Sequence, residues 1–485
     1  MNFKIVGRII GMTILIEAGF MIVPMLLCLY DGEPDVAVSF AIPIVMMLAV
    51  GALLLYYGRR AQKNFYVQES FVATGLSWVA MSFFGALPFW MSRQIPSFVD
   101  ALFEIVSGFT TTGASILLDV EALSRGILYW RSFSHWLGGM GVLVFLLALV
   151  PAASKVTGYN MHLLRAESPG PSVGKLTPRL RHTAIILYGL YITLTVLCVL
   201  FLLAGGMPLF ESLCTAYGTA GTGGFGIKNT SLGGYSTYLQ AVVTIFMFLF
   251  GVNFSLYFLL LLRQFGNVWR DEELRLYAGV TLGAILLITF DIRGMFETLG
   301  QALHHAAFQV SSIITTTGFS TVDFELWPSF SKSILLVLMC FGACAGSTGG
   351  GLKIARILLL FKAAHRNVQN VLHPRRVQVV QVNGQTVDEQ VLHNVNAYLS
   401  IYCMLCFGSF ILISVDGFSM GTNISAVLAC FNNIGPGFEL VGATANYSIY
   451  SNFSKIILIL DMLLGRLEIF PILVLFSKKT WSRLH

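Results

Sequence analysis

The chain alternates long apolar stretches with short polar ones. Ten of the apolar stretches are long enough to cross a hydrocarbon core of ~30 Å as helices, which takes about 20 residues each. This pattern predicts an all-α polytopic membrane protein. The first stretch exceeds the length of a signal-peptide core and lacks a small-residue cleavage site, so we expect it to be retained as a span. The ten predicted spans lie at about 5–30, 37–58, 70–92, 128–152, 183–205, 237–262, 275–291, 329–362, 394–415 and 453–477.

Four shorter apolar segments lie between the spans, and each leads into a motif that contains glycine. A helix of about 11 to 18 residues is too short to cross the membrane. Irregular backbone at membrane depth must be buried in protein or line a water-filled space. We therefore expect re-entrant helices at about 98–109, 208–218, 296–313 and 421–432.

The four motifs are related in sequence, which indicates an internal repeat. Loops 1 to 4, at residues 110–115, 221–226, 315–320 and 432–437, read TTTGAS, GTGGFG, TTTGFS and NNIGPG. Loops 1 and 3 match best, since Phe103 and Phe308 each stand ten residues before the loop glycine. In loop 2 we favour Gly224 over Gly223 as the equivalent glycine, because the residues that follow it resemble loop 3.

The repeat predicts four pseudo-symmetric units of span, pore helix and span around one central pore, with two extra N-terminal helices. The predicted units are 1–68 for the two N-terminal helices, followed by repeats 1 to 4 at 69–160, 161–268, 269–375 and 376–485.

Loops of this composition suit the coordination of an alkali cation. A cation that leaves water needs oxygens in place of its hydration shell, and backbone carbonyls can supply them. Glycine allows the unusual backbone angles required, and the pore helices would direct their partial negative ends at the site. Small residues also allow close helix packing, but four loops that each follow a short helix favour the pore. The predicted ligand positions are Thr111, Thr112, Gly113, Thr222, Gly223, Gly224, Thr316, Thr317, Gly318, Asn433, Ile434 and Gly435.

The composition excludes a water-soluble protein. Only 11% of the 485 residues are charged and 56% are hydrophobic, whereas soluble domains carry about 25% charged residues. The net charge is +6. With ten spans, the basic residues between them fall on one side, including Lys4, Arg8, Arg59, Lys155, Arg165, Lys175, Lys353, Arg356, Lys362 and Lys478.

This basic side is the cytoplasmic one by the positive-inside rule, which places both termini in the cytoplasm. Acidic residues collect on the opposite side, at Asp31, Glu33, Asp35, Asp119, Glu121, Asp323 and Glu325. The basic excess therefore reflects topology, and we expect no nucleic acid partner.

Other candidate chemistry is weak. The eight cysteines lie in apolar stretches, where sulfur behaves as a small hydrophobe. Adjacent His304 and His305 lack the spacing of a helical metal site, and Glu104 and Glu211 suit the start of a helix without a further role. We find no catalytic cluster and expect no enzyme.

Five motifs occur in the order expected for one protein family, and the resemblance covers essentially the whole chain. They are loops 1, 3 and 4, the glycine-rich ACAGSTGGGLK of 343–353 and the LLGRLEIFP of 463–471. The chain resembles the membrane subunit of the Trk/Ktr/HKT superfamily of potassium transporters, and most of all its bacterial TrkH/TrkG branch. Loop 2 departs from the family pattern because it is richer in glycine.

The resemblance implies channel-like potassium uptake across the bacterial inner membrane, with K⁺ as the transported ion. It also implies a homodimer in membrane lipid and a separate cytosolic nucleotide-binding ring, similar to TrkA, docked on the basic loops. The alternative is a proton- or sodium-coupled symport, for which broken helices in inverted halves would be expected.

The segment from Ser329 to Phe361 is too long for one straight span and contains a glycine-rich stretch. The resemblance implies a gate beneath the pore loops, and the alternative is a tolerated kink. The gate residues would be Gly346, Ser347, Thr348, Gly349, Gly350 and Gly351.

Arg466 lies about midway along the last predicted span, where a charge costs roughly 2.5–3.5 kcal/mol on insertion scales. The resemblance implies that it is an electrostatic barrier within the pore, as part of the gate. The alternative is a structural pairing with Asp461 or Glu468.

Overall fold

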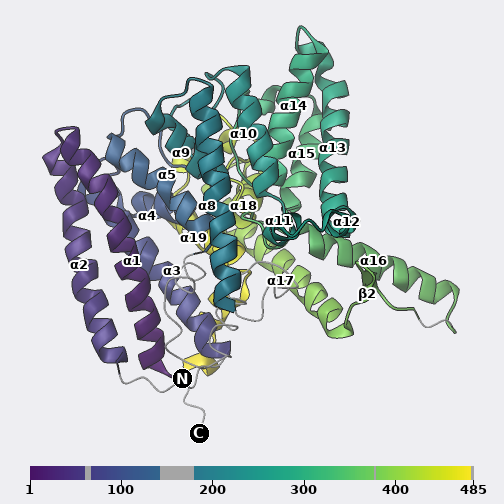
Figure 1. The fold of residues 1–485 in the computed structure, drawn as a ribbon, viewed down its shortest axis with the longest axis horizontal. Helices are drawn as coiled ribbons and strands as arrows, with labels where there is room; N and C mark the ends of the chain where they lie inside the picture. Colours follow the sequence, from purple (N-terminus) through teal and green to yellow (C-terminus); the bar gives the residue numbers. More distant parts are fainter. Residues whose placement is uncertain (60–66, 142–179, 376–377, 482–485) are drawn as a thin grey trace.

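The computed structural model describes residues 1–59, 67–141, 180–375 and 378–481. These residues are almost entirely helical (Figure 1), apart from a short antiparallel hairpin in which Gln381 pairs with Thr386. The prediction of an all-α membrane protein is confirmed. The helices are α1 Phe3–Tyr30, α2 Pro34–Gly58, α3 Val67–Met91, α4 Phe98–Phe109, α5 Arg125–Gly139, α8 Leu180–Ala204, α9 Leu209–Ala220, α10 Thr237–Phe250, α11 Phe254–Leu261, α12 Phe265–Arg270, α13 Glu272–Ile292, α14 Leu299–Ile314, α15 Ser329–Cys340, α16 Ile354–Leu372, α17 Glu389–Ile413, α18 Met420–Phe431, α19 Asn452–Arg466, α20 Phe470–Phe476 and α21 Lys478–Trp481, and the strands are β1 Gln381–Val382 and β2 Gln385–Thr386.

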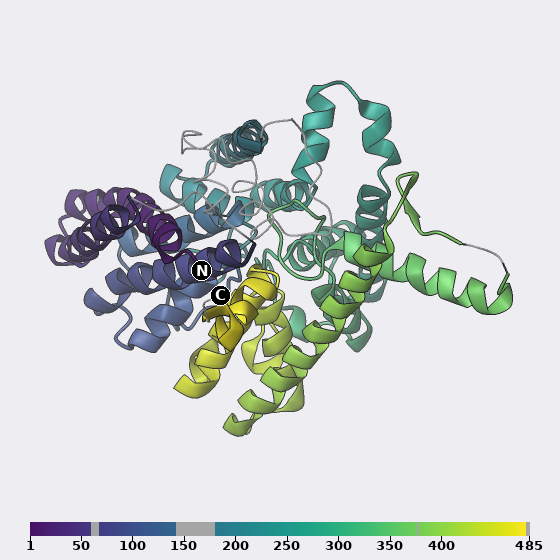
Figure 2. The same ribbon diagram turned by 90° about the horizontal axis from the view of Figure 1, so that it is seen from below.

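The four repeats each contain a first helix, a short helix and a second helix. They are α3, α4 and α5; α8, α9 and α10; α13, α14 and α15; and α17, α18 and α19. Figure 2 shows them grouped around a central region, with the α1–α2 pair on one flank and α16 with its hairpin projecting from another. The short helices α4, α9 and α18 have 12 residues and α14 has 16, so none of them could cross a membrane. The predicted fourfold architecture is confirmed.

The two extra helices form a close antiparallel pair. Gly11 of α1 and Gly51 of α2 face each other, and a Cβ added to either would lie about 3 Å from the carbonyl oxygen of the other. Small residues at a crossing let two helix backbones approach closely in a membrane. The pair is tied to repeat 1 by an ion pair of 2.9 Å between Asp31 and Arg125 of α5.

The second helices of repeats 2, 3 and 4 are interrupted rather than straight, and α5 of repeat 1 ends at Gly139. Among the described residues, six helices are long and apolar enough to span, and a seventh span results if α10 and α11 count as one despite a bend of 91°. The predicted span at 237–262 is thus bent between α10 and α11, and the predicted span at 453–477 is interrupted between α19 and α20. The expected break within 329–362 is present, and the part of 128–152 beyond residue 141 lies outside the described residues.

Close backbone contacts lie at the ends of two of these helices. A Cβ added to Gly138 of α5 would lie less than 3.0 Å from the carbonyl oxygen of Phe109, the last residue of α4. Gly465 near the end of α19 has the same relation to Phe431, the last residue of α18. Average hydropathy does not record such contacts, so a hydropathy scan joins the two halves into one span.

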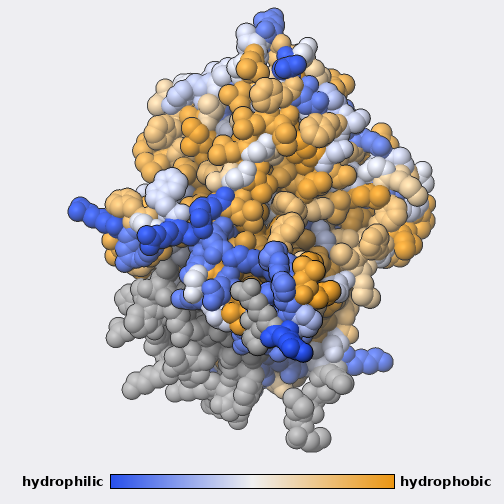
Figure 3. All heavy atoms as spheres, turned by 90° about the vertical axis from the view of Figure 1, so that its right-hand side faces the viewer, coloured by the Kyte–Doolittle hydropathy of each residue, from blue (hydrophilic) through white to orange (hydrophobic). Residues whose placement is uncertain are grey.

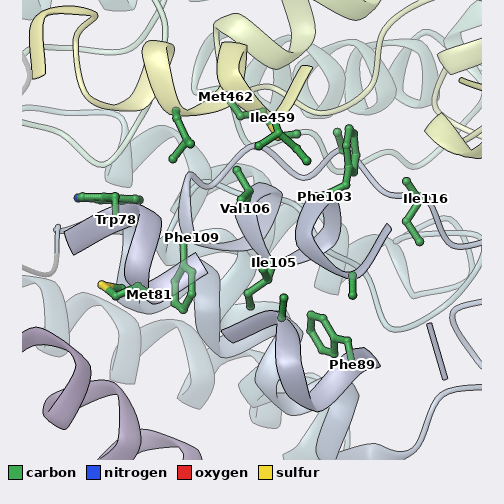
Figure 4. Close-up of a cluster of buried hydrophobic side chains, with 14 of the residues drawn as sticks. Trp78, Met81, Phe89, Phe103, Ile105, Val106, Phe109, Ile116, Ile459 and Met462 are labelled. Carbon is green, nitrogen blue, oxygen red and sulfur yellow. The ribbon is translucent and has the colours of Figure 1, made fainter. Parts of the chain in front are cut away.

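The short helix α4 is buried on several sides. Figure 4 shows Phe103, Ile105, Val106 and Phe109 of this helix surrounded by side chains of α3 and α19, among them Trp78, Met81, Ile459 and Met462.

The outer face of the molecule is instead apolar and exposed. Figure 3 shows a broad hydrophobic surface bordered by hydrophilic residues, as expected for contact with lipid.

The beginning and end of the described chain lie together. The rings of Phe3 and Trp481 are stacked with their centroids 6.4 Å apart, and the Gln68 side chain donates to the carbonyl oxygen of Thr480. The basic loop is predicted at 153–182; its residues 153–179 lie outside the described residues, and α8 begins at Leu180.

Candidate functional site

The four loops share one backbone conformation. Each has two residues with positive φ, separated by one residue, and the second of the two is glycine. The pairs are Thr111 (55°) and Gly113 (80°), Thr222 (54°) and Gly224 (76°), Thr316 (58°) and Gly318 (85°), and Asn433 (56°) and Gly435 (96°). This pattern aligns Gly224, rather than Gly223, with the glycines of the other loops.

The residue between the two positive-φ positions is held by its own short helix. Its amide donates to the carbonyl oxygen five residues earlier, at 2.8 to 2.9 Å in all four loops. Among the described residues, no backbone amide donates to the carbonyl oxygens of these middle residues, which leaves the oxygens free for another ligand. The middle residues are Thr112, Gly223, Thr317 and Ile434.

The loops form a closed ring. A Cβ added to the positive-φ glycine of one loop would lie less than 3.0 Å from the carbonyl oxygen of the middle residue in the next loop. The contacts run from Gly113 to Gly223, from Gly224 to Thr317, from Gly318 to Ile434, and from Gly435 back to Thr112. Four loops in this cyclic order surround one axis, and no side chain larger than hydrogen fits at the glycines. The structure thus brings together all four sets of predicted ligand residues.

A cavity of about 180 Å³ lies on one side of the ring. Its lining includes the ring glycines, which are Gly113, Gly224, Gly318 and Gly435, and residues that follow them in the chain, such as Ser115, Asn229 and Thr444. The hydroxyl of Tyr447, also in the lining, donates to the carbonyl oxygen of Gly435 at 2.7 Å. Ions could approach the ring from this cavity.

The glycine-rich segment lies against the other side. The amide of Gly350 donates to the Thr316 hydroxyl at 2.7 Å, and a Cβ added to Gly350 would lie 2.7 Å from the carbonyl oxygen of Asn432. These partners precede the ring glycines of loops 3 and 4, whereas the cavity is lined by residues that follow them. The segment is held in shape by Lys353, which donates to the carbonyl oxygen of Gly349, and by Glu273, which accepts from the Ala345 amide at 2.6 Å.

Arg466 connects the glycine-rich segment to repeat 1. Its guanidinium donates to the carbonyl oxygen of Thr348 at 2.8 Å and to those of Gly138 and Gly139 at 2.5 and 2.6 Å. It is the last residue of α19 rather than the middle of a straight span, because the chain turns at Leu467–Ile469.

The two carboxylates considered as partners of Arg466 have other contacts. Asp461 accepts a hydrogen bond from Ser409 at 2.6 Å, and Glu468 forms an ion pair with Arg356.

Comparison with known proteins agrees with this architecture. The sequence profile of the TrkH family, described as "Cation transport protein", matches residues 37–291 and 295–483. The chain belongs to the TrkH family.

Its relatives within this family extend over the full length. The chain is 36% identical to the Trk system potassium uptake protein TrkH of Salmonella typhimurium, over 99% of this chain and 100% of that protein. It is 33% identical to the Trk system potassium uptake protein TrkG of Escherichia coli, over 99% of both. The crystal structure of the potassium transporter TrkH from Vibrio parahaemolyticus superposes with a TM-score of 0.88 at 30% identity, over 99% of this chain and 100% of that one. The resemblance inferred from the sequence motifs is confirmed.

The other candidate residues of this TrkH-family chain occupy separate positions. Glu211, in the first turn of α9, accepts from the Tyr235 hydroxyl at 2.7 Å and lies 3.6 Å from Lys228. His304 and His305 bond to Gln240 and Thr321 at 2.8 and 3.0 Å, on two different neighbours. The described residues contain no group of three or more His, Cys, Asp or Glu able to hold a metal ion.

Glu104 differs from the expectation of an ordinary helix-start acid. It is the seventh residue of α4, is fully buried and pairs with Arg131. Sequence reasoning missed Arg131 and Tyr447. A charge inside an apolar span was the signal that singled out Arg466, and the same criterion identifies Arg131 within 128–152. No comparable signal marks Tyr447, whose partner is a backbone oxygen.

Proposed function

We propose that this chain is the membrane subunit of a potassium uptake system in the bacterial inner membrane, and that its four loops form the selectivity filter. This proposal rests on the closed ring in which each loop glycine lies against the carbonyl oxygen of the next loop's middle residue. The ring surrounds one axis with backbone oxygens. The names of the relatives, Trk system potassium uptake proteins, support K⁺ as the transported ion.

The filter would replace the hydration shell of K⁺ with neutral backbone oxygens. The ligands would come from Thr111–Gly113 and the three matching triplets at 222–224, 316–318 and 433–435. The short helices α4, α9, α14 and α18 end at these loops, so the partial negative charge of each C-terminus adds to the attraction for a cation. This arrangement needs no carboxylate ring.

The glycine-rich segment and Arg466 would form the gate. The segment, including Gly346–Gly351, lies against loops 3 and 4, and Arg466 holds it through the carbonyl oxygen of Thr348. A cation passing this point would meet the positive charge of the guanidinium, which repels it. Opening would require the Arg466–Thr348 contact to break and the segment to move aside.

The subunit would act as a homodimer, with both termini in the cytoplasm and a cytosolic nucleotide-binding ring of the TrkA kind as its regulator. The stacking of Phe3 on Trp481 supports placing both ends on one side. α16 projects from the molecule in Figure 2 and would offer a surface to such a partner; its basic residues Lys362 and Arg366 pair with Glu272 and Glu389 of this chain.

Ion selectivity in proteoliposomes tests the filter. Gly318→Ser places a side chain where the loop 4 carbonyl lies and where φ is 85°, and should lower the ratio of Rb⁺ to Na⁺ uptake. Gly283→Ser in α13, where nothing lies within 4 Å of the added atom, is the matched control. Unchanged ratios in Gly113→Ser, Gly318→Ser and Gly435→Ser would contradict the filter assignment.

A further inference from the structure

An ion pair lies buried beside loops 1 and 2, and its arginine, Arg131, is also part of the lining of the cavity at the ring. Arg131 of α5 donates from Nε to Oε1 of Glu104 in α4 at 2.6 Å, and the two side chains are only 3% and 0% exposed. Two charges are seldom buried in an apolar core, because removing them from water is costly unless their hydrogen bonds are satisfied. The hydrogen bonds of this pair to loops 1 and 2 offset the free-energy cost of burying the two charges.

Both members of the pair bond to the loops. The Glu104 carboxylate accepts from the Ser115 hydroxyl at 2.9 Å and from the Ile116 amide at 3.0 Å. Arg131 donates from Nη1 to the carbonyl oxygen of Gly226 at 2.8 Å, and from Nη2 to the Ser115 hydroxyl at 3.3 Å. Ser115 and Gly226 each stand two residues after their ring glycine. The ion pair therefore joins loops 1 and 2 at equivalent positions of their two repeats.

The same helix also packs against the side chain of loop 2. The Arg131 guanidinium lies 3.6 Å from the ring centroid of Phe225, and the His135 ring stacks on the same Phe225 at 4.1 Å. A Cβ added to Gly223 would collide with the His135 ring. This packing explains why loop 2 carries glycine where loops 1 and 3 carry threonine, and it fixes loop 2 from behind.

The other repeats show that this position does not require an ion pair. Nine residues before the ring glycine, where repeat 1 has Glu104, repeats 2, 3 and 4 have Thr215, Gln309 and Ala426. Aligning Gly138 with Gly465 by their matching contacts places Leu458 of repeat 4 at the position of Arg131. An apolar pair thus occupies the equivalent place in repeat 4, so a buried pair of charges is not a general need of the repeat.

Replacing a buried ion pair by apolar residues often leaves stability unchanged or raises it. A role in positioning therefore accounts for the pair better than a role in stability. The arginine fork can bond several groups at fixed geometry. Here it joins Glu104 and Ser115 of repeat 1 to the carbonyl oxygen of Gly226 in loop 2.

We propose that the Glu104–Arg131 ion pair is a positioning element that sets the spacing of loops 1 and 2 and thereby the preference for potassium over sodium. This inference rests on the proposed filter. Selectivity depends on the size of the carbonyl cage or on the number of oxygens that reach the ion. Either quantity changes if two of the four loops can separate or approach.

Uptake of Rb⁺ and Na⁺ by proteoliposomes tests this role. The double variant Glu104→Gln/Arg131→Leu takes each residue from the equivalent position of another repeat and leaves no unpaired buried charge. Arg131→Lys keeps the charge but replaces the planar fork by a single ammonium group. The matched control is Arg125→Gln, which removes a charge from the same helix but breaks the outer ion pair with Asp31.

A several-fold fall in the Rb⁺/Na⁺ ratio of the double variant and of Arg131→Lys, with an unchanged ratio in Arg125→Gln, is the expected result. An unchanged ratio in either folded test variant overturns the proposal, and so does an equal fall in the control. If the double variant does not yield monodisperse protein, Arg131→Lys decides. Gly318→Ser separates the two ideas: if it shifts the ratio while the ion-pair variants do not, the filter stands and only the positioning role fails.

Discussion

Arg466 at the end of α19 donates a hydrogen bond of 2.8 Å to the carbonyl oxygen of Thr348 in the glycine-rich segment. This contact joins residues 118 positions apart and brings a positive charge next to the segment proposed as the gate. The same guanidinium is bonded to the end of α5. One side chain therefore links three of the four repeats.

Removing this side chain should make the pore leak. Arg466→Ala deletes both the charge barrier and the contact with Thr348, so basal Rb⁺ uptake into proteoliposomes should rise several-fold. Arg466→Lys keeps a charge but has only one ammonium group for three carbonyl oxygens, and we expect an intermediate rise. A fall in uptake with normal protein yield would assign Arg466 a structural role instead.

Shortening the glycine-rich segment should also raise basal flux. Deleting Gly350 and Gly351 removes the amide that donates to Thr316 and the backbone that lies against Asn432. The shortened segment would no longer reach loops 3 and 4, so Rb⁺ uptake should increase without the regulator. Regulated uptake that persists unchanged after the deletion would show that the segment is not the gate.

The hydroxyl of Tyr447 should matter for loop 4. Tyr447→Phe retains the ring beside Phe103 but loses the bond to the carbonyl oxygen of Gly435, a loss of about 1 kcal/mol for an average hydrogen bond. We expect a lower Rb⁺/Na⁺ ratio with a small decrease in thermal stability.

Tyr450→Phe is the control for this variant. Its hydroxyl donates to Asn423 at 2.9 Å, away from the loop carbonyls, so the loss in stability should be similar and the ion ratio unchanged. Equal effects of the two variants on the ratio would argue against a specific role for Tyr447.

The contact between Gly465 and Phe431 should be intolerant of any side chain. A Cβ at this position would overlap the carbonyl oxygen at the end of α18, and overpacking of this kind costs about 1–3 kcal/mol. Gly465→Ala should therefore lower the thermal unfolding temperature in detergent.

Gly408→Ala provides the comparison within α17, where nothing lies within 4 Å of the added atom. It should leave the unfolding temperature unchanged or raise it slightly, because alanine favours helix more than glycine does. A similar loss of stability in both variants would mean that the close approach at Gly465 is unimportant.

The sequence alone predicted much of the architecture because membrane insertion acts on local composition. Helices such as α1, α2 and α17 contain long apolar runs, which hydropathy detects. The four loops were recognisable because glycine must stand where φ is positive and neighbouring backbones meet, as at Gly113 and Gly318. These requirements act within a few residues and so leave a pattern in the chain.

Other features depended on partners far away in the sequence. The break after Arg466, the contact of Tyr447 with Gly435 and the pairing of Glu104 with Arg131 are set by which helices lie side by side, and no local pattern encodes this. Loop 2 shows both cases. The residues after Gly224 already favoured it as the equivalent glycine, and the shared φ pattern aligns it with the glycines of the other loops. Only the His135 ring explained why Gly223 cannot carry a side chain.

The sequence by itself thus determined the membrane environment, the number of repeats and the residues of the four loops, since each is imposed by local hydropathy and backbone freedom. The tertiary structure decided the cyclic order of the loops, the partners of Arg466 and the burial of Arg131. These depend on distances between segments separated by tens to hundreds of residues, which packing brings together.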